Sequence, residues 1–390
     1  MDSEIKLVLL ISESMLYDRK KEIRDLISRR YIHWEIFFKL LQYHELAPVA
    51  YILLKDVPLP EDVHKILENA YYFNLAHNIL LWEEFLKISK VLNDHDITFA
   101  PLKGFSFMGE IYPDINYRSM ADIDIMVKEE DLKLVGEILQ NLGYSKQLGG
   151  LEERYWREKQ CHIAYVKPFG TSQKVLIEVH WDLDFKRLKQ PILPLLWTRL
   201  EKRNMEGVPI SFLSIEDSIF SLVLHKRRLG NIFSLKGTCD LACLLKKFSH
   251  KIDWEYILKW SRVSKMRTVL YFSLFQTRFI SSNLFSEAIL DELKIPLWKR
   301  LAINKLILRY TFATDIDIKK TYLRAHFFLY DSIWEAVRYI LNIPREQFAK
   351  FYNLEPYSEN TKLLYRMRLL YFPLNFLVNL GRRGYEKQGL

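Results

Sequence analysis

The sequence predicts an α+β protein in which a small mixed β-sheet is flanked by N-terminal helices and a C-terminal helical domain. Three observations lead to this fold class. Apolar side chains recur at helical spacing before residue 93, short runs with strand-like alternation occupy residues 97–181, and helical spacing returns after residue 191. We therefore divide the chain into an N-terminal helical segment (1–96), a sheet-containing core (97–190) and a C-terminal helical domain (191–390).

The N-terminal segment is predicted to end in one long helix. A Pro-rich turn at residues 57–60 precedes it, and the helix is expected over residues 61–93. We predict one broad apolar face on it, formed by Ile66, Tyr72 or Phe73, Ile79, Leu80, Phe85, Ile88 and Val91. The polar residues 93–96 end this helix, and the periodicity then becomes that of strands.

Four strands are predicted in the core, at residues 97–102, 122–127, 162–166 and 174–181. The first runs into Lys103 and Gly104, after which residues 105–111 begin a helix. A second helix at 129–142 stops at Gly143, a suitable C-terminal cap. The last two strands form an antiparallel pair around a turn at 170–173. Beyond residue 191 helices dominate, including 213–226, 235–248 and 254–261.

Asp122 and Asp124 are the most informative residues of the chain. Acids at i and i+2 share one face of a strand, while Ile123, Ile125 and Val127 share the other face. Burying two acids together is costly unless a cation neutralises them, and Mg²⁺ prefers such oxygen ligands. An Asp-x-Asp pair by itself is common on exposed strands that bind nothing. The Gly-containing turn before the strand, whose N–H groups are suited to a triphosphate, strengthens the metal interpretation.

A third carboxylate is expected from the strand at 174–181. Glu178, His180 and Asp182 share one face of this strand, and apolar residues share the other face. We choose Glu178 as the third acid and keep Asp182, nearer the strand end, as the alternative. Glu178 is then expected to take the acceptor proton or to help hold the metal. His180 is either a direct participant or a hydrogen-bonded structural residue.

Several motifs together resemble the nucleotidyltransferase superfamily to which DNA polymerase β belongs, and more narrowly a bacterial group of uncharacterised nucleotidyltransferases. The motifs are Lys103-Gly104, Tyr112-Pro113, Arg118, Asp122-Ile123-Asp124 and Glu178-Val179-His180-Trp181. The resemblance implies a nucleotidyltransferase core that holds Mg²⁺, or Mn²⁺, through Asp122, Asp124 and Glu178. It also implies transfer of a nucleoside monophosphate from an NTP such as ATP to a hydroxyl or phosphate on a small molecule, peptide or protein. The narrower family occurs among natural-product tailoring genes.

The predicted nucleotide-binding residues are Lys103, Gly104, Ser106, Arg118 and His180. The superfamily usually has Gly-Ser or Gly-Gly where this chain has Lys103 and Gly104. Lys103 is either a point charge for the triphosphate or a surface lysine, and Arg118 either binds a phosphate oxygen or braces Asp122. Two other functions stay open, and this departure motivates the first of them. One is a nucleotide-binding or antitoxin-like module without turnover, and the other is transfer of a different phosphate-linked group such as a sugar.

The C-terminal half resembles the helical region of the same family, with His225 near one helix end and Asp240 on the next helix. We favour a salt bridge or a helix cap for Asp240 over a catalytic role. The basic run at residues 226–228 either attracts phosphates or forms a solvated face, and the second is the more common use of such runs.

The composition is that of a globular protein, with 27% charged and 49% hydrophobic residues. The net charge of +9 suits a phosphate-rich ligand equally as well as a solvated basic surface. We expect no nucleic-acid partner, because the chain has no basic tract interleaved with aromatic residues. Its cysteines, Cys161, Cys239 and Cys243, are predicted to be reduced core residues. We predict a cytoplasmic location without a membrane span, since the apolar run at 369–380 is short and contains Pro373.

Overall fold

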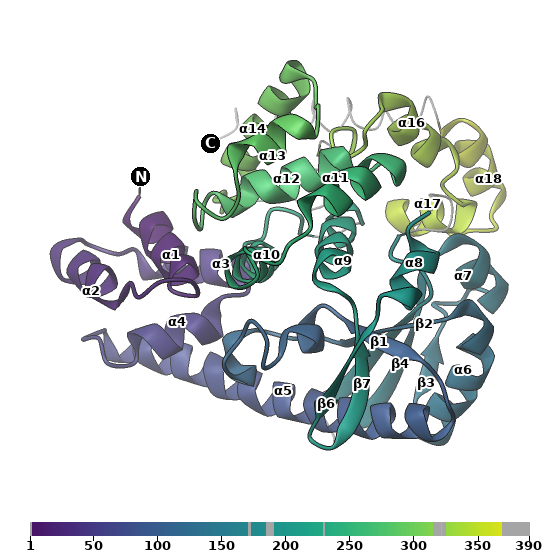
Figure 1. The fold of residues 1–390 in the computed structure, drawn as a ribbon, viewed down its shortest axis with the longest axis horizontal. Coiled ribbons are helices and arrows are strands. Elements are labelled where there is room, and N and C mark those ends of the chain that lie inside the picture. The colour runs from purple at the N-terminus through teal and green to yellow at the C-terminus, as the bar shows by residue number, and fades with distance from the viewer. Residues whose placement is uncertain are drawn as a thin grey trace. The chain divides into compact units, whose positions relative to one another are not determined.

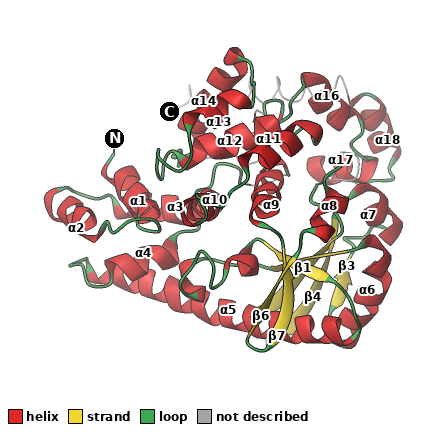
Figure 2. Cartoon of the chain, viewed as in Figure 1, coloured by secondary structure: helices red, strands yellow, loops and turns green. Residues whose placement is uncertain are grey.

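The computed structural model describes residues 2–170, 173–184, 191–228, 231–314, 321 and 325–368. It confirms the predicted α+β class, with a five-stranded sheet, a two-stranded sheet and many helices (Figure 2). The chain divides into two compact units, Met1–Asp331 and Ser332–Leu390. The first unit contains the predicted helical segment, the predicted core and most of the predicted helical domain. The boundaries at residues 97 and 190 stay predictions.

Five helices precede the sheet: α1 (Ser3–Glu13), α2 (Lys20–Arg29), α3 (Trp34–His44), α4 (Ala47–Leu54) and α5 (Glu61–Asp94). The long helix α5 is confirmed, but half of its predicted apolar face is wrong. Exposed side chains on α5 include Ile66, Tyr72, Phe73 and Ile79. The buried face instead contains Asn78, whose Nδ2 donates to the carbonyl oxygens of Ile115 and Arg118 at 2.7 and 2.8 Å. The buried face of α5 therefore includes a polar residue that anchors a neighbouring loop, and it differs from the purely apolar face that we predicted.

The main sheet contains β1 (Phe99–Leu102), β2 (Ile123–Val127), β3 (Ser145–Gln147), β4 (His162–Phe169) and β5 (Gln173–His180). Its strand order is β1-β2-β5-β4-β3; β2 and β5 are parallel, and the other pairs are antiparallel. The predicted turn at 170–173 falls partly on residues 171 and 172, which lie outside the described residues.

One face of this sheet forms the hydrophobic core. Ile125 of β2 and Ile177 and Val179 of β5 are 0–1% exposed and pack with apolar residues of α5 and of α6 (Leu132–Asn141). Figure 1 shows α5 running below the strands and α6 beside them. Because side chains alternate along a strand, the acids of β2 and β5 face the other side of the sheet.

One local prediction is wrong, and two further features were not predicted. The helix expected at 105–111 is a single 3-10 turn, η1 (Gly104–Phe107), and β3 was not predicted. The region after residue 191 also contains a hairpin, β6 (Glu201–Met205) and β7 (Val208–Phe212). The first four residues of β6 are polar, so it carries no strand-like alternation. Its pairing with β7 depends on Glu206 and Gly207, which turn the chain with φ of 49° and 84°. Shorter 3-10 turns lie at η2 (Ile115–Tyr117) and η3 (Glu129–Asp131).

The remaining helices of the first unit are α7 (Glu153–Lys159), α8 (Leu193–Thr198), α9 (Ile215–Arg227), α10 (Lys236–Lys247), α11 (Trp254–Val263), α12 (Arg267–Thr277), α13 (Glu287–Glu292) and α14 (Leu297–Tyr310). The predicted helices at 213–226, 235–248 and 254–261 are confirmed as α9, α10 and α11. The second unit contains α16 (Ile333–Leu341), α17 (Arg345–Tyr352) and α18 (Glu359–Arg366). Within the described residues, no helix combines the length and apolar character needed to cross a bilayer. The apolar run at 369–380 lies outside them.

Candidate active site

The parallel pairing of β2 and β5 brings two of the predicted acids side by side. Asp124 is directly opposite Glu178 in the register of the two strands, so both carboxylates leave the same face. Asp122 precedes the first residue of β2. Asp124 is 5% exposed, whereas Asp122 and Glu178 are half-buried and reach solvent. The three acids thus form one cluster with a buried inner member and two more accessible outer members.

Two cationic side chains neutralise the inner acid. Oδ1 of Asp124 lies 2.8 Å from Nζ of Lys103 and 2.9 Å from Nε2 of His180. The same Nε2 lies 3.2 Å from Oε2 of Glu178. Although burial opposes ionisation, the charge of Lys103 and the hydrogen bond from His180 hold the pKa of Asp124 below its ordinary value. Burial likewise disfavours imidazolium, yet hydrogen bonds to Asp124, Cys161 and Glu178 raise the pKa of His180 to about 10.

The pKa values of the two outer acids, Asp122 and Glu178, are shifted in opposite directions. Burial and the charge of Asp124 raise the pKa of Asp122 to about 6. Burial also opposes ionisation of Glu178, but the hydrogen bond from His180 and the charge of His162 lower the pKa of that carboxyl. Asp122 therefore carries much of the cost of crowding three acids together, which is the situation that a bound cation relieves.

The turn between β1 and η1 holds Lys103 in an uncommon backbone conformation, with φ of 50° and ψ of −142°. Ser106 closes this turn, since its N and Oγ both donate to the carbonyl oxygen of Lys103, at 2.7 and 2.5 Å. Gly104 allows close packing, because a Cβ there would lie 3.1 Å from Sδ of Met120 and 3.4 Å from Nη1 of Arg118 and would displace these side chains slightly. The Lys103 side chain is 9% exposed, so it is a buried partner of Asp124 and the surface-lysine interpretation is wrong.

Arg118 is engaged by Asp240 of α10. Its Nε and Nη2 donate to the Asp240 carboxylate at 2.9–3.1 Å, and the hydroxyl of Tyr112 donates to the same carboxylate at 2.5 Å. Arg118 is 9% exposed and Asp240 0%. The favoured interpretation of Asp240 as a salt-bridge residue is confirmed, although its partner Arg118 lies in the segment before β2 and not on another helix. Arg118 lies against the Lys103-Gly104 turn, but its fork is occupied by a protein carboxylate.

Two residues at the start of β4, Cys161 and His162, also belong to the cluster and were not predicted as site residues. His162 pairs with His180 across the strands, and the two rings lie 4.9 Å apart. Nε2 of His162 is 3.5 Å from Oε1 of Glu178, and its Nδ1 is 3.5 Å from Sγ of Cys161. Although burial disfavours a thiolate, Arg228 and His162 lower the pKa of Cys161 to about 5. All three cysteines are free and buried, as predicted.

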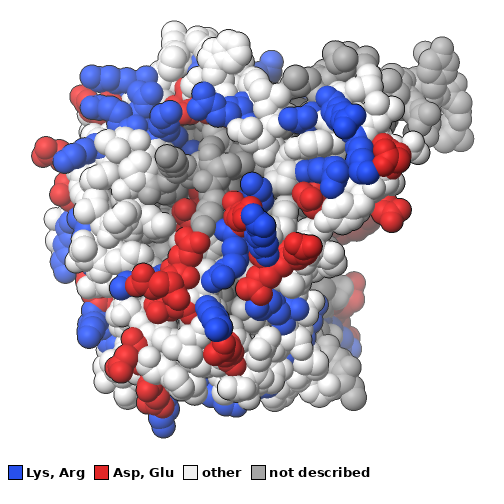
Figure 3. Space-filling view, turned by 90° about the vertical axis from the view of Figure 1, so that its right-hand side faces the viewer, with Lys and Arg blue, Asp and Glu red and all other residues white. Residues whose placement is uncertain are grey.

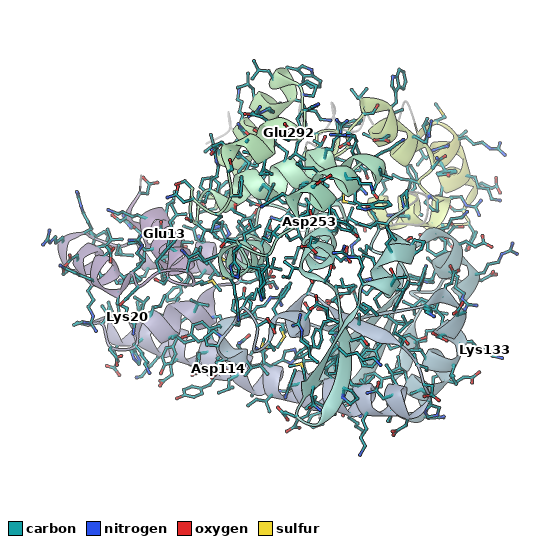
Figure 4. All side chains as sticks on the ribbon, viewed as in Figure 1. Glu13, Lys20, Asp114, Lys133, Asp253 and Glu292 are labelled. Carbon is teal, nitrogen blue, oxygen red and sulfur yellow. The ribbon has the colours of Figure 1, made fainter. Side chains whose placement is uncertain are left out.

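The basic run at 226–228 is buried, so its interpretation as a solvated face is wrong. Lys226, Arg227 and Arg228 are 8%, 3% and 9% exposed. In contrast, peripheral lysines such as Lys20 and Lys133, labelled in Figure 4, point away from the ribbon. On the face drawn in Figure 3, acidic and basic side chains are interspersed. Part of the positive charge of this chain therefore lies inside the first unit.

The alternative third acid, Asp182, lies just beyond β5. It is 8% exposed, and its Oδ1 accepts a hydrogen bond from the backbone N of Asp184 at 3.3 Å. Burial raises the pKa of Asp182 to about 7. The structure brings Glu178, and not Asp182, into register with Asp124.

The donor set fits a hard divalent cation. Asp124, Glu178 and His180 each offer a ligand atom within 4.8 Å of the others. Asp122 is not part of this close-spaced group, although its carboxylate is near enough to Asp124 for the two charges to interact. Carboxylate oxygens are the ligands that Mg²⁺ and Mn²⁺ prefer. A second set, Cys161, His162 and His180, is equally close-spaced. A guanidinium group of Arg228 lies 3.3 Å from the Cys161 sulfur, which disfavours a cation at that second set.

Comparison with protein families decides the classification. A family model described as an uncharacterised nucleotidyltransferase matches residues 31–279. The chain belongs to this uncharacterised nucleotidyltransferase family. A solved structure that is similar to it is an antigenic nucleotidyltransferase-like protein from Paracoccidioides brasiliensis, which is 16% identical, with a TM-score of 0.33 over 57% of this chain and 91% of that chain. No curated protein matches. Membership of the nucleotidyltransferase family supports a transferase activity and an NTP substrate.

Proposed function

We propose that this nucleotidyltransferase-family protein moves a nucleoside monophosphate from an NTP to a hydroxyl or phosphate on a small molecule, peptide or protein, and releases pyrophosphate. Mg²⁺, or Mn²⁺, held by Asp122, Asp124 and Glu178 serves the reaction. When bound, such an ion neutralises phosphate charge and helps position the triphosphate for in-line displacement.

One observation carries the proposal: Asp124 and Glu178 lie opposite each other on parallel strands, with Asp122 beside them, on the face of the sheet away from the hydrophobic core. Structural acids are rarely crowded this way, because each carboxylate raises the cost of ionising its neighbours. Here Lys103 and His180 offset that cost in the protein alone. Family membership supports the reaction class.

The burial of each site residue indicates its role in the proposed reaction. Oδ1 of the buried Asp124 is already engaged by an ion pair with Lys103 and a hydrogen bond with His180, so this acid is held in place. Glu178 is half-buried and faces solvent, so it is the acid placed to accept the proton of the incoming hydroxyl. Lys103 brings a positive charge from the β1–η1 turn to the position where phosphate oxygens approach the acids.

The test is transfer from a radiolabelled donor, with all four NTPs and several nucleotide sugars, in Mg²⁺ or Mn²⁺, together with a measurement of pyrophosphate release. Asp122→Asn and Asp124→Asn should each lower transfer about a hundredfold or more, on the order of 3 kcal/mol in barrier. Asp114→Asn is the matched control, because Asp114 caps η2 on the surface and asparagine caps equally well.

The outcomes separate the candidate functions. Near-normal transfer by both site variants would contradict the metal assignment. NTP binding without pyrophosphate release in the wild type would favour a binding module, and transfer from a nucleotide sugar alone would favour the other group-transfer reaction. Circular dichroism of all three variants should match the wild type, because none of these aspartates belongs to the apolar core.

A further inference from the structure

Arg228, at the C-terminal end of α9, is a buried cation without a carboxylate partner among the described residues. Its Nη1 donates to Sγ of Cys161 at 3.3 Å, its Nη2 lies 2.6 Å from Nδ1 of His225, and its Nε has no hydrogen-bond partner. The side chain is only 9% exposed. Removing a guanidinium from water is costly unless acceptors satisfy its donors, so this arrangement leaves donor capacity for an anion.

The neighbouring arginines show what a structural arginine looks like in this protein. Arg227 is paired with Asp184 at 2.6 Å and also donates to the carbonyl oxygen of Lys265. Arg118 is paired through its fork with Asp240. In both, a protein carboxylate occupies the guanidinium fork, whereas Arg228 contacts only one sulfur atom, that of Cys161, and one imidazole nitrogen, that of His225, within the part of the chain that the structure describes. Two of the arginines thus have a fork that a carboxylate occupies, whereas Arg228, among the described residues, has a fork without a carboxylate and an Nε without a hydrogen-bond partner.

The position of Arg228 connects it to the acid cluster. Sγ of Cys161, which it contacts, lies within 4.8 Å of ligand nitrogens of His162 and His180, and both histidines contact Glu178. Burial opposes its charge, but the charges of Cys161, Glu178 and Asp124 raise the pKa of Arg228. His225, its other partner, is exposed, so solvent reaches this side of α9. Figure 1 shows α9 above the ends of the strands.

We propose that Arg228 binds the triphosphate oxygens of the donor nucleotide, and that Cys161 and His225 position its guanidinium for that contact. The planar fork of arginine matches two phosphate oxygens at once, which an ammonium group does not. This inference rests on the proposed function, since it adds a second cation, besides Lys103, to the site of the same substrate. It transfers to Arg228 the phosphate contact that the sequence motif places on Arg118.

The test uses magnesium tripolyphosphate as the ligand, because its binding does not depend on which base the site accepts. In isothermal titration, Arg228→Gln should weaken binding about tenfold or more, as expected for loss of charge-assisted hydrogen bonds. Arg199→Gln is the matched control: Arg199 is a partly buried arginine paired with Glu216 and Asp217. The affinity of Arg199→Gln for magnesium tripolyphosphate should equal that of the wild type.

If Arg228→Gln does not fold, the variant Arg228→Lys still tests the proposal. Arg228→Lys retains the charge but loses the fork, so it should also weaken tripolyphosphate binding, though by a smaller factor. Unchanged affinity in either Arg228 variant, with circular dichroism like that of the wild type, would overturn the proposal. If the wild type binds neither tripolyphosphate nor any NTP, the proposed function itself fails. If wild type and Arg228→Gln bind equally while Lys103→Ala binds weakly, only the role of Arg228 fails.

Cys161 is tested as a positioning residue by a matched pair. Cys161→Ser keeps an acceptor for Nη1 of Arg228, and Cys161→Val removes it while filling the buried space. We expect weaker tripolyphosphate binding in the valine variant and near-normal binding in the serine variant. A purely structural role would change the thermal stability of the variants without separating their affinities, and equal affinities would overturn the positioning role.

Discussion

Lys103 combines backbone strain with a buried charge, and two substitutions separate these properties. Its φ of 50° and ψ of −142° lie near a region that is adopted almost solely by glycine and that costs other residues about 1–3 kcal/mol. Its ammonium group lies 2.8 Å from Asp124. Lys103→Ala removes the charge and the aliphatic stem but keeps the strain, whereas Lys103→Gly removes the charge, the stem and the strain. Both variants lose the ion pair with Asp124, so that loss cancels in the difference between their free energies of unfolding.

We expect Lys103→Gly to be more stable than Lys103→Ala by about 1 kcal/mol. This value is the strain of about 1–3 kcal/mol reduced by the extra chain entropy of glycine, about 0.5–1 kcal/mol. Urea unfolding followed by tryptophan fluorescence measures the difference, and Trp82 reports on this turn because its ring lies 5.5 Å from that of Phe105. The midpoints should differ by about a few tenths of a molar, with equal slopes.

The same pair of variants tests why the strain is tolerated. Both should lose affinity for magnesium tripolyphosphate to the same extent, because both lack the ammonium group. If the alanine variant is as stable as the glycine variant, the strain argument is refuted. If the glycine variant binds tripolyphosphate like the wild type, the charge of Lys103 serves only to neutralise Asp124.

Three further predictions concern the acids and the buried cations. Glu178→Gln should keep most NTP affinity but lose most turnover in a single-turnover assay, and Asp182→Asn should be milder; the reverse order would exchange their roles. Asp240→Asn should lower the free energy of unfolding by about 3–5 kcal/mol in thermal melts, because Arg118 would lose its carboxylate, and little change would mean that the pair is not buried in solution. Burial lowers the pKa of Lys226 from 10.5 to about 7, so above pH 7 the unfolded chain binds a proton that the native chain does not, and stability from this group rises with pH. Relative to Lys226→Met, the wild type should gain about 2 kcal/mol between pH 7 and pH 9 in urea unfolding, and parallel pH profiles would contradict this.

The acids were predictable because their signal is local. Asp122, Asp124 and Glu178 stand in apolar runs with strand alternation, which places them on one face without knowledge of any partner. His162 was not predictable in this way. Its contact with Glu178 depends on the register of β4 against β5, which the turn determines. A shift of one residue would put His162 opposite Trp181 and turn it to the apolar face. The hairpin β6–β7 was not predicted for a related reason, since its mostly polar first strand is defined only by its pairing with the second.

The two arginines show where sequence proximity misleads. Arg118 stands four residues before Asp122, which made it the natural candidate for a phosphate contact, yet the fold gives it Asp240 from α10 as a buried partner. Arg228 stands in a basic run that resembles a solvated face, yet α9 carries it to Cys161 beside the acid cluster. What an arginine can bind depends on whether a protein carboxylate already occupies its fork, and that is decided by contacts between distant segments. Asp184 and Asp240 pair with the other two arginines, and no carboxylate among the described residues pairs with Arg228, so its fork can bind phosphate oxygens. A substitution that places a carboxylate beside the guanidinium of Arg228 should therefore abolish phosphate binding there.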